Sequence, residues 1–175
     1  MSFGQHLPPL MAALHALPCT YDFVPLHQFQ SARDNKSWIG TWTGNKTLAG
    51  AEYRVFGHDR AGGRAAIWLA HEPVTSSDLP FAARLLTQPI VFFGGHGELL
   101  VLASDFADYL WLLAGGFGPS EAAANSDGAE PMTAQPSFVA FAEAHAPQAR
   151  KAATAVLAQA RAAYPRFAPT VRALC

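Results

Sequence analysis

Three histidines at the ends of predicted strands are the first residues in this chain that suggest chemistry. They are His58, His71 and His96, and the carboxylates of Asp59 and Glu72 directly follow the first two. Imidazole nitrogens and carboxylate oxygens are common zinc ligands. Spacing this loose does not bring the side chains to one point, however, and histidines in solvated loops are the simpler interpretation. We therefore expect no metal site and no cofactor.

The signature motifs of several enzyme classes are absent from the sequence. There is no GxSxG, no P-loop, no HExxH and no dinucleotide-binding glycine pattern. Residues 96–98 match the HxE of zinc deaminases, but the PCxxC that supplies the other ligands is missing. The glycine-rich segment 92–98 has backbone N–H groups for an anion, yet it lies between two predicted strands and indicates an ordinary hairpin turn. These observations predict a protein without catalytic residues.

Composition and charge narrow the class of protein. The chain has 175 residues, 50% of them hydrophobic and 14% charged, which indicates one globular domain rather than a disordered chain. With a net charge of -1, the protein has no overall positive field of the kind that non-specific nucleic-acid binding usually needs, so we expect no direct binding to nucleic acid. No Lys or Arg occurs between Arg84 and Arg150, whereas the segment after Ser137 is basic. Either these two regions pack together and neutralise each other, or the acidic region meets a basic partner.

The second alternative makes the acidic region a partner-binding surface. Aromatic side chains are frequent hot spots in protein interfaces, so Tyr109 or Trp111 is the expected anchor. The surrounding carboxylates are Asp105, Asp108, Glu121, Asp127 and Glu130. In the competing interpretation, the two rings belong to the core and the carboxylates serve only solubility and helix capping.

The N-terminal half is expected to contain two helices and a hairpin. Leucines at helical spacing behind a Pro-Pro pair predict a short helix over 7–17. Residues 31–44 predict a second helix, capped by Ser31, with two tryptophans one turn apart and a glycine at its end. Two aromatic and β-branched runs within 52–71 flank a Gly-Gly pair, which predicts a β-hairpin.

The second half has the clearest pattern. Nearly continuous apolar runs at 90–93 and 99–103 predict a central strand pair covered by helices. An N-cap at Ser104 begins a helix that ends at Gly115, and its apolar circumference must be sandwiched or meet a partner. The Gly- and Pro-rich segment 115–136 predicts a mobile connection, followed by C-terminal helices over about 137–165.

Together these elements predict one α+β domain over residues 1–175. Its sheet is mostly antiparallel, with helices at the N-terminus, after the central strand pair and at the C-terminus. The N-terminal residues do not match a secretory signal and no apolar run is long enough to span a membrane, so a cytoplasmic location is expected. Cys19 and Cys175 are expected to be inert thiols, and a bridge joining the chain ends is the alternative.

Several of these motifs resemble the SUKH superfamily. They are TWTGN at 41–45, an aromatic FGxD followed by a GG hairpin with Trp68, and a glycine-turn strand pair that leads directly into the FxxYLWLL helix. The resemblance covers about residues 20–118. It implies an α+β domain, no catalytic residues, and kinship with bacterial immunity proteins and yeast cell-wall-assembly regulators.

Three functions follow as hypotheses. The first is a non-catalytic, immunity-type protein that covers a cognate toxin with a basic surface. The second is a stand-alone regulatory or scaffold protein of the same superfamily. The third is an enzyme or small-ligand protein built from scattered residues such as His58, Asp59, His71 and His96.

Overall fold

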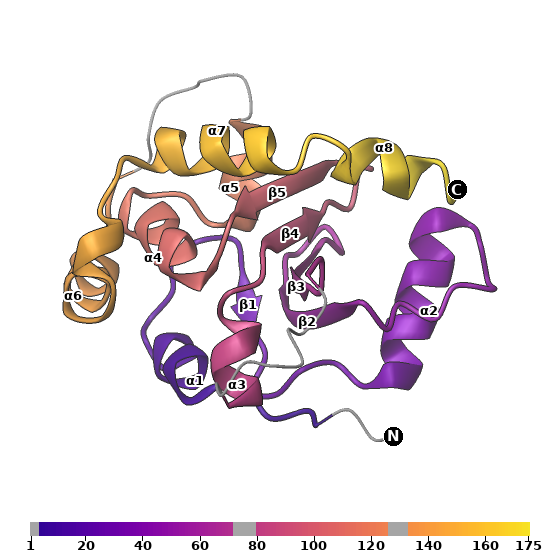
Figure 1. The fold of residues 1–175 in the computed structure, drawn as a ribbon, viewed down its shortest axis with the longest axis horizontal. Coiled ribbons are helices and arrows are strands. Elements are labelled where there is room, and N and C mark those ends of the chain that lie inside the picture. The colour runs from indigo at the N-terminus through magenta and orange to yellow at the C-terminus, as the bar shows by residue number, and fades with distance from the viewer. Residues whose placement is uncertain (1–3, 72–79, 126–132) are drawn as a thin grey trace.

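The computed structural model describes residues 4–71, 80–125 and 133–175. One five-stranded antiparallel sheet occupies the centre, with its strands in the order β1-β2-β3-β4-β5 (Figure 1). The strands are β1 (Val24–Pro25), β2 (Tyr53–His58), β3 (Arg64–Trp68), β4 (Ile90–Phe93) and β5 (Leu99–Ala103). The expected α+β class with an antiparallel sheet is therefore confirmed.

Eight α-helices and one 3-10 turn surround the sheet within the described residues. The helices are α1 (Pro9–His15), α2 (Ala32–Thr43), α3 (Phe81–Leu85), α4 (Phe106–Ala114), α5 (Pro119–Ala124), α6 (Pro136–His145), α7 (Ala153–Ala163) and α8 (Phe167–Arg172), and the 3-10 turn is Pro147–Ala149. In this part of the chain no helix combines the length and the apolar character needed to cross a bilayer.

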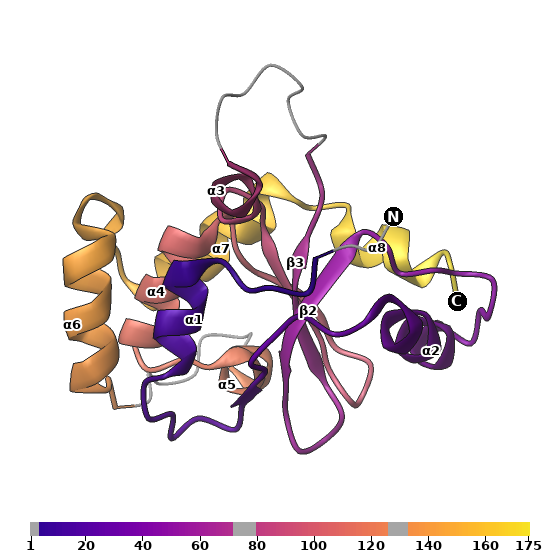
Figure 2. The same cartoon turned by 90° about the horizontal axis from the view of Figure 1, so that it is seen from below.

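Helices cover both faces of the sheet, which explains why its strands are apolar without alternation. On β4, Ile90 and Phe92 join a core with α1, α4, α5 and α6, whereas Val91 and Phe93 join a second core with α2 and α8. Figure 2 shows the sheet between α1, α4 and α6 on one side and α2 and α8 on the other. We call these the α4 face and the α2 face.

The two edge strands are protected in different ways. β1 has only two residues, and one of them is Pro25, which has no N–H to offer a further strand. β5 is also an edge strand, which corrects its expected central position. Helix α7 packs against β5, with Val156 in the core of the α4 face and Ala160 in the core of the α2 face. This helix gives β5 its buried surroundings.

Every residue of the strongly apolar helix α4 except Ala107 is buried, in agreement with its all-round apolar pattern. Its N-cap is Asp105 rather than the expected Ser104, because the Asp105 carboxylate accepts a hydrogen bond from the Asp108 backbone N–H at 2.8 Å. The buried ring of Phe117 and helix α5 follow. The connection expected over 115–136 therefore contains a buried ring and a helix that the sequence pattern did not predict.

The C-terminal segment contains more breaks than the sequence pattern indicated. α6 occupies the expected position, but the next helix does not run continuously from Pro147. A 3-10 turn ends at Ala149, and α7 begins only at Ala153. Helix α8 was not anticipated at all, and it places Phe167 and Val171 in the core of the α2 face.

Candidate functional site

The two aromatic residues expected to anchor a partner lie in the core of the α4 face. Tyr109 is 1% exposed and Trp111 is 5% exposed. The Trp111 indole Nε1 donates a hydrogen bond to the Ala146 carbonyl oxygen at 2.7 Å. Both rings therefore pack mainly in the core, which favours the competing interpretation of the sequence, although Trp111 also lines a surface pocket with Arg150 and Lys151.

The described carboxylates of the acidic segment have structural partners. Asp108 forms an ion pair with Lys151 at 2.7 Å, which joins the acidic middle of the chain to its basic tail. One oxygen of Glu121 accepts the Asp22 backbone N–H at 2.8 Å, and Asp105 caps α4. The Asp108–Lys151 pair agrees with mutual neutralisation of the two regions. The other two candidates, Asp127 and Glu130, lie outside the described residues.

The three histidines considered as possible metal ligands, His58, His71 and His96, each have different surroundings. His58 Nδ1 lies 3.3 Å from the Asp59 carbonyl oxygen, and His71 Nε2 lies 2.7 Å from the Tyr164 hydroxyl. His96 is exposed in the β4–β5 turn, which is the hairpin turn that the sequence indicated. Within residues 4–71, 80–125 and 133–175, no cluster of three His, Cys, Asp or Glu side chains could hold a metal ion.

Both cysteines are free thiols in the structure. Cys19 is partly buried, and burial raises the pKa of its thiol. Cys175 is exposed at the chain end. The bridge that was the alternative does not form here.

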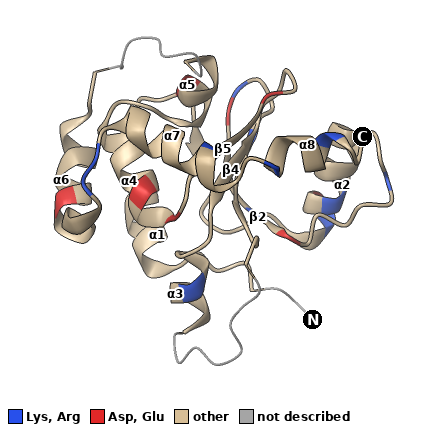
Figure 3. Cartoon of the chain, turned by 45° about the horizontal axis from the view of Figure 1, so that its top comes forward, with Lys and Arg blue, Asp and Glu red and all other residues tan. Residues whose placement is uncertain are grey.

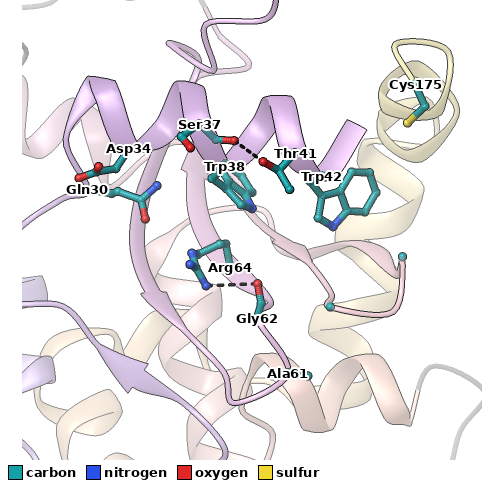
Figure 4. A pocket seen from close by; sticks show the side chains of 12 residues that line it. Gln30, Asp34, Ser37, Trp38, Thr41, Trp42, Ala61, Gly62, Arg64 and Cys175 are labelled. Atoms are coloured by element: carbon teal, nitrogen blue, oxygen red, sulfur yellow. Dashed lines mark hydrogen bonds between the residues drawn. The ribbon is translucent and has the colours of Figure 1, made fainter. Parts of the chain in front are cut away.

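An open groove lies at the α2 face, where the sequence had suggested no site. It runs between α2 and the tips of the β2–β3 and β4–β5 hairpins, and its volume is about 860 Å³. Figure 4 shows side chains of α2 on one side, Arg64 below them, and Cys175 near α8. The lining residues are Gln30, Asp34, Ser37, Trp38, Thr41, Trp42, Ala61, Gly62, Arg64, Gly95, Gly97 and Cys175.

Helix α2 places two tryptophans one turn apart along this groove. Ser31 caps the helix by accepting the Asp34 N–H at 3.1 Å, and Gly44 ends it with a left-handed φ of 74°. Trp38 and Trp42 both pack edge-to-face on Phe93 of β4, with ring centroids 5.0 Å and 5.2 Å away. The shared contact with one buried ring holds both indoles in place.

The two hairpin turns form the opposite wall because they touch each other. A Cβ added to Gly95 would lie 2.0 Å from the Ala61 carbonyl oxygen, so only glycine permits this approach of the two backbones. The Trp42 indole Nε1 donates to the Gly94 carbonyl oxygen at 3.0 Å and ties α2 to the β4–β5 turn. The β4–β5 turn therefore contacts both the β2–β3 turn and helix α2.

Two buried N–H donors in the lining residues have no acceptor within the described chain. They are the indole Nε1 of Trp38 and the guanidinium Nε of Arg64. Arg64 Nη1 donates to the carbonyl oxygens of Gly62 at 3.2 Å and Gly63 at 3.3 Å, which orients the guanidinium (Figure 4). A buried donor without an acceptor costs about 1–3 kcal/mol. Such a cost is removed when a bound molecule supplies the acceptor.

The groove is thus equipped to bind a molecule through apolar ring surface and hydrogen-bond donors. From the sequence, Trp38 and Trp42 were noted only as two residues one turn apart on a predicted helix. The available signal was their spacing on a helix in which each tryptophan directly follows a polar residue, Ser37 or Thr41. Arg64 gave no signal, because its role depends on the approach of two hairpins.

We compared the chain with known protein families, curated proteins and solved structures. No family model, no curated protein and no solved structure matches the chain.

Proposed function

We propose that this protein is a non-catalytic protein-binding domain of immunity type. It acts in the cytoplasm and neutralises a cognate bacterial toxin by covering part of the toxin surface. The groove at the α2 face makes the contact. The toxin-neutralising role rests on the resemblance to the SUKH superfamily, and the contact surface rests on the geometry of the groove.

The observation that carries the proposal is the pair of unpaired buried donors on Trp38 and Arg64. Buried polar groups in folded proteins almost always have hydrogen-bond partners, and exceptions call for an explanation. Other buried atoms without a partner, such as His15 Nε2 and Glu121 Oε2, lie elsewhere in the described residues, but the atoms of Trp38 and Arg64 belong to two residues that line one open groove. Tryptophan and arginine are also the residue types most enriched among interface hot spots. A protein partner supplies both the missing acceptors and the apolar contact.

The test is a growth assay with the toxin encoded beside this protein's gene. Bacteria that express the toxin should grow when wild-type protein is co-expressed. Ser37→Trp places a large ring at an exposed lining position and should abolish rescue by blocking the groove. Ala140→Trp introduces the same ring at an exposed position of α6 and should rescue as wild type does.

Two results would contradict the proposal. If wild-type protein gives no rescue, the toxin-neutralising function is wrong. If Ser37→Trp rescues as well as Ala140→Trp while both variants are folded, the groove is not the contact surface.

A further inference from the structure

We infer that the groove recognises a carboxylate, presented by an acidic side chain of the protein partner. The inference rests on the proposed function in one respect, namely that the groove binds a protein. The acidic segment of the sequence had suggested a partner with a basic surface, whereas this inference gives the partner an acidic contact group.

The guanidinium of Arg64 provides the first reason. Its Nη1 is held by the carbonyl oxygens of the β2–β3 turn, and its Nε is unpaired within the described chain. The side of a guanidinium that carries Nε matches the two oxygens of a carboxylate through parallel hydrogen bonds. The Nη1 hydrogen bonds hold the guanidinium in one orientation beside the groove, with Nε buried and unpaired. The indole N–H of Trp38 offers a further donor in the same groove.

The cations around helix α2 provide the second reason. Arg33, Lys36 and Lys46 line a shallow pocket of about 310 Å³ that shares Ser37 and Thr41 with the groove. None of the three cations forms an ion pair with a carboxylate in the part of the chain that the structure describes. Figure 3 shows Lys and Arg on α2, α3 and α8, and Asp and Glu on α4, α5 and α6; α2 also carries Asp34. An acidic partner is therefore attracted to the α2 face before it docks.

The same surface argues against a nucleic acid as the ligand. Binding to a nucleic-acid backbone depends on several cations that contact successive phosphates, whereas Arg64 is the one Lys or Arg among the described groove-lining residues, which also include Asp34. The whole chain carries a net charge of -1, so the positive region is local. A single carboxylate beside an apolar side chain fits Arg64 and the two indole rings better than a polyanion does.

The experiment follows the indole N–H signals by NMR during titration with short peptides. The chain has four tryptophans, and the Trp38 signal is identified by its loss in Trp38→Phe. The probe is a blocked peptide of alternating glutamate and phenylalanine, and the matched peptide has glutamine in place of glutamate. The acidic peptide should shift the Trp38 signal in a saturable way. The neutral peptide should bind at least about tenfold more weakly, as expected for loss of a charge-assisted hydrogen bond.

Matched variants locate the binding to Arg64. Arg64→Gln should weaken acidic-peptide binding at least about tenfold, and Arg64→Lys should fall between Arg64→Gln and wild type because it keeps the charge but not the planar donors. Arg60→Gln is the control: Arg60 lies on the same hairpin turn, its side chain is 90% exposed, and it does not line the groove. Its affinity should stay within about twofold of wild type. An unchanged Trp42 indole signal shows that each variant is folded.

Several outcomes would overturn the inference. They are equal binding of the acidic and neutral peptides, an Arg64→Gln affinity equal to that of wild type, or no Trp38 shift at millimolar acidic peptide. A shift with short single-stranded DNA and none with the acidic peptide would replace the carboxylate by a nucleic acid.

Failure of this inference is distinguishable from failure of the proposed function. If the acidic peptide binds through Arg64 but growth is not rescued, the carboxylate site stands and the toxin-neutralising role is wrong. If the groove is needed for rescue while the neutral peptide binds as well as the acidic one, the proposed function stands and the carboxylate inference is wrong.

Discussion

The two faces of the sheet differ in whether the polar groups of their aromatic side chains have hydrogen-bond partners. On the α4 face, the indole N–H of Trp111 reaches the Ala146 carbonyl oxygen, and the Tyr21 hydroxyl donates to the Leu113 carbonyl oxygen at 2.6 Å. On the α2 face, the indole N–H of Trp38 has no acceptor within the described chain. These two donors on the α4 face are satisfied within the chain, although His15 Nε2 and Glu121 Oε2 on that side have no partner in the described residues. On the α2 face, the indole donor that lines the groove is the unpaired one.

The difference shows that hydrophobicity alone does not locate an interface. Helix α4 is the more apolar of the two helices, and this apolar surface is enclosed by α6, α7 and the sheet. Helix α2 is more polar and is packed on one side only, where Ile39 and the inner edges of its tryptophans meet the sheet. Substitutions on the α4 face should therefore change stability, and substitutions in the groove should change binding.

The largest effect is expected for Leu110→Ala on the α4 face. Leu110 is buried in α4, and its truncation leaves a cavity among helices that cannot fully close. The free energy of unfolding should fall by about 2–5 kcal/mol, measured by urea denaturation. Binding of the acidic peptide to the folded variant should be unchanged. A loss below about 0.5 kcal/mol would contradict the assignment of Leu110 to a tightly packed core.

Gly95→Val should affect both stability and binding, because this glycine lets the two hairpin turns that form one wall of the groove touch each other. Its new Cβ would meet the Ala61 carbonyl oxygen, and backbone atoms cannot move away as a flexible side chain can. We expect about 1–3 kcal/mol of destabilisation and weaker peptide binding. His96→Ala changes an exposed residue of the same turn and should have neither effect. Equal behaviour of the two variants would show that the turns need not touch.

The Asp108–Lys151 ion pair tests how the α4 face uses charge. The Asp108 side chain is 8% exposed and that of Lys151 is 27% exposed, so solvent weakens the pair only in part. Asp108→Asn should lower the free energy of unfolding by about 1–2 kcal/mol. In a double-mutant cycle with Lys151→Met, the two changes should not be additive. Additive losses would mean that the pair contributes nothing to stability.

Local patterns account for the elements that the sequence predicted correctly. The strands at 90–93 and 99–103 were found because glycines at 94, 95 and 97 separate two apolar runs. Helix α2 was found because a serine cap and a glycine stop bracket it. The cap of α4 was assigned one residue too early, since Ser104 and Asp105 are both good N-cap residues and sequence cannot rank them.

The groove depends on contacts that no local pattern contains. Its walls come from α2, from the turn at 61–64 and from the turn at 95–97, which are brought together only by the order of the strands. The acidic segment was easier to notice in the sequence because no Lys or Arg interrupts its carboxylates between Arg84 and Arg150. The pairing of Asp108 with Lys151, which precedes α7, became visible only in the structure.

His15 should make the α4 face sensitive to pH. Burial lowers the pKa of its imidazole below the ordinary value of 6.5, although a hydrogen bond between Nδ1 and the Leu26 carbonyl oxygen opposes the change. Below pH 6.5 the unfolded chain binds a proton that the folded protein resists, so stability falls as the pH decreases. The slope cannot exceed about 1.4 kcal/mol per pH unit for this one group.

The measurement is urea denaturation of wild type and His15→Phe across this pH range. The variant keeps an aromatic ring beside Phe56 but has no group to titrate at this position, so its stability should depend less on pH. His27→Gln removes an exposed neighbouring histidine and should leave most of the slope in place. Identical slopes for wild type and His15→Phe would assign the pH dependence to other groups.

The smallest effect, and the most local, concerns the start of α4. Asp105→Ala removes the carboxylate that accepts the Asp108 N–H and should cost about 1 kcal/mol in the free energy of unfolding. Ser104→Ala should cost less than about 0.5 kcal/mol, because Ser104 does not cap the helix in this structure. Neither variant should change peptide binding, since both residues lie outside the groove. If Asp105→Ala weakened binding of the acidic peptide, or of the toxin itself, without loss of stability, the partner would contact the α4 side as well. The assignment of stability to the α4 face and of binding to the α2 face would then be wrong.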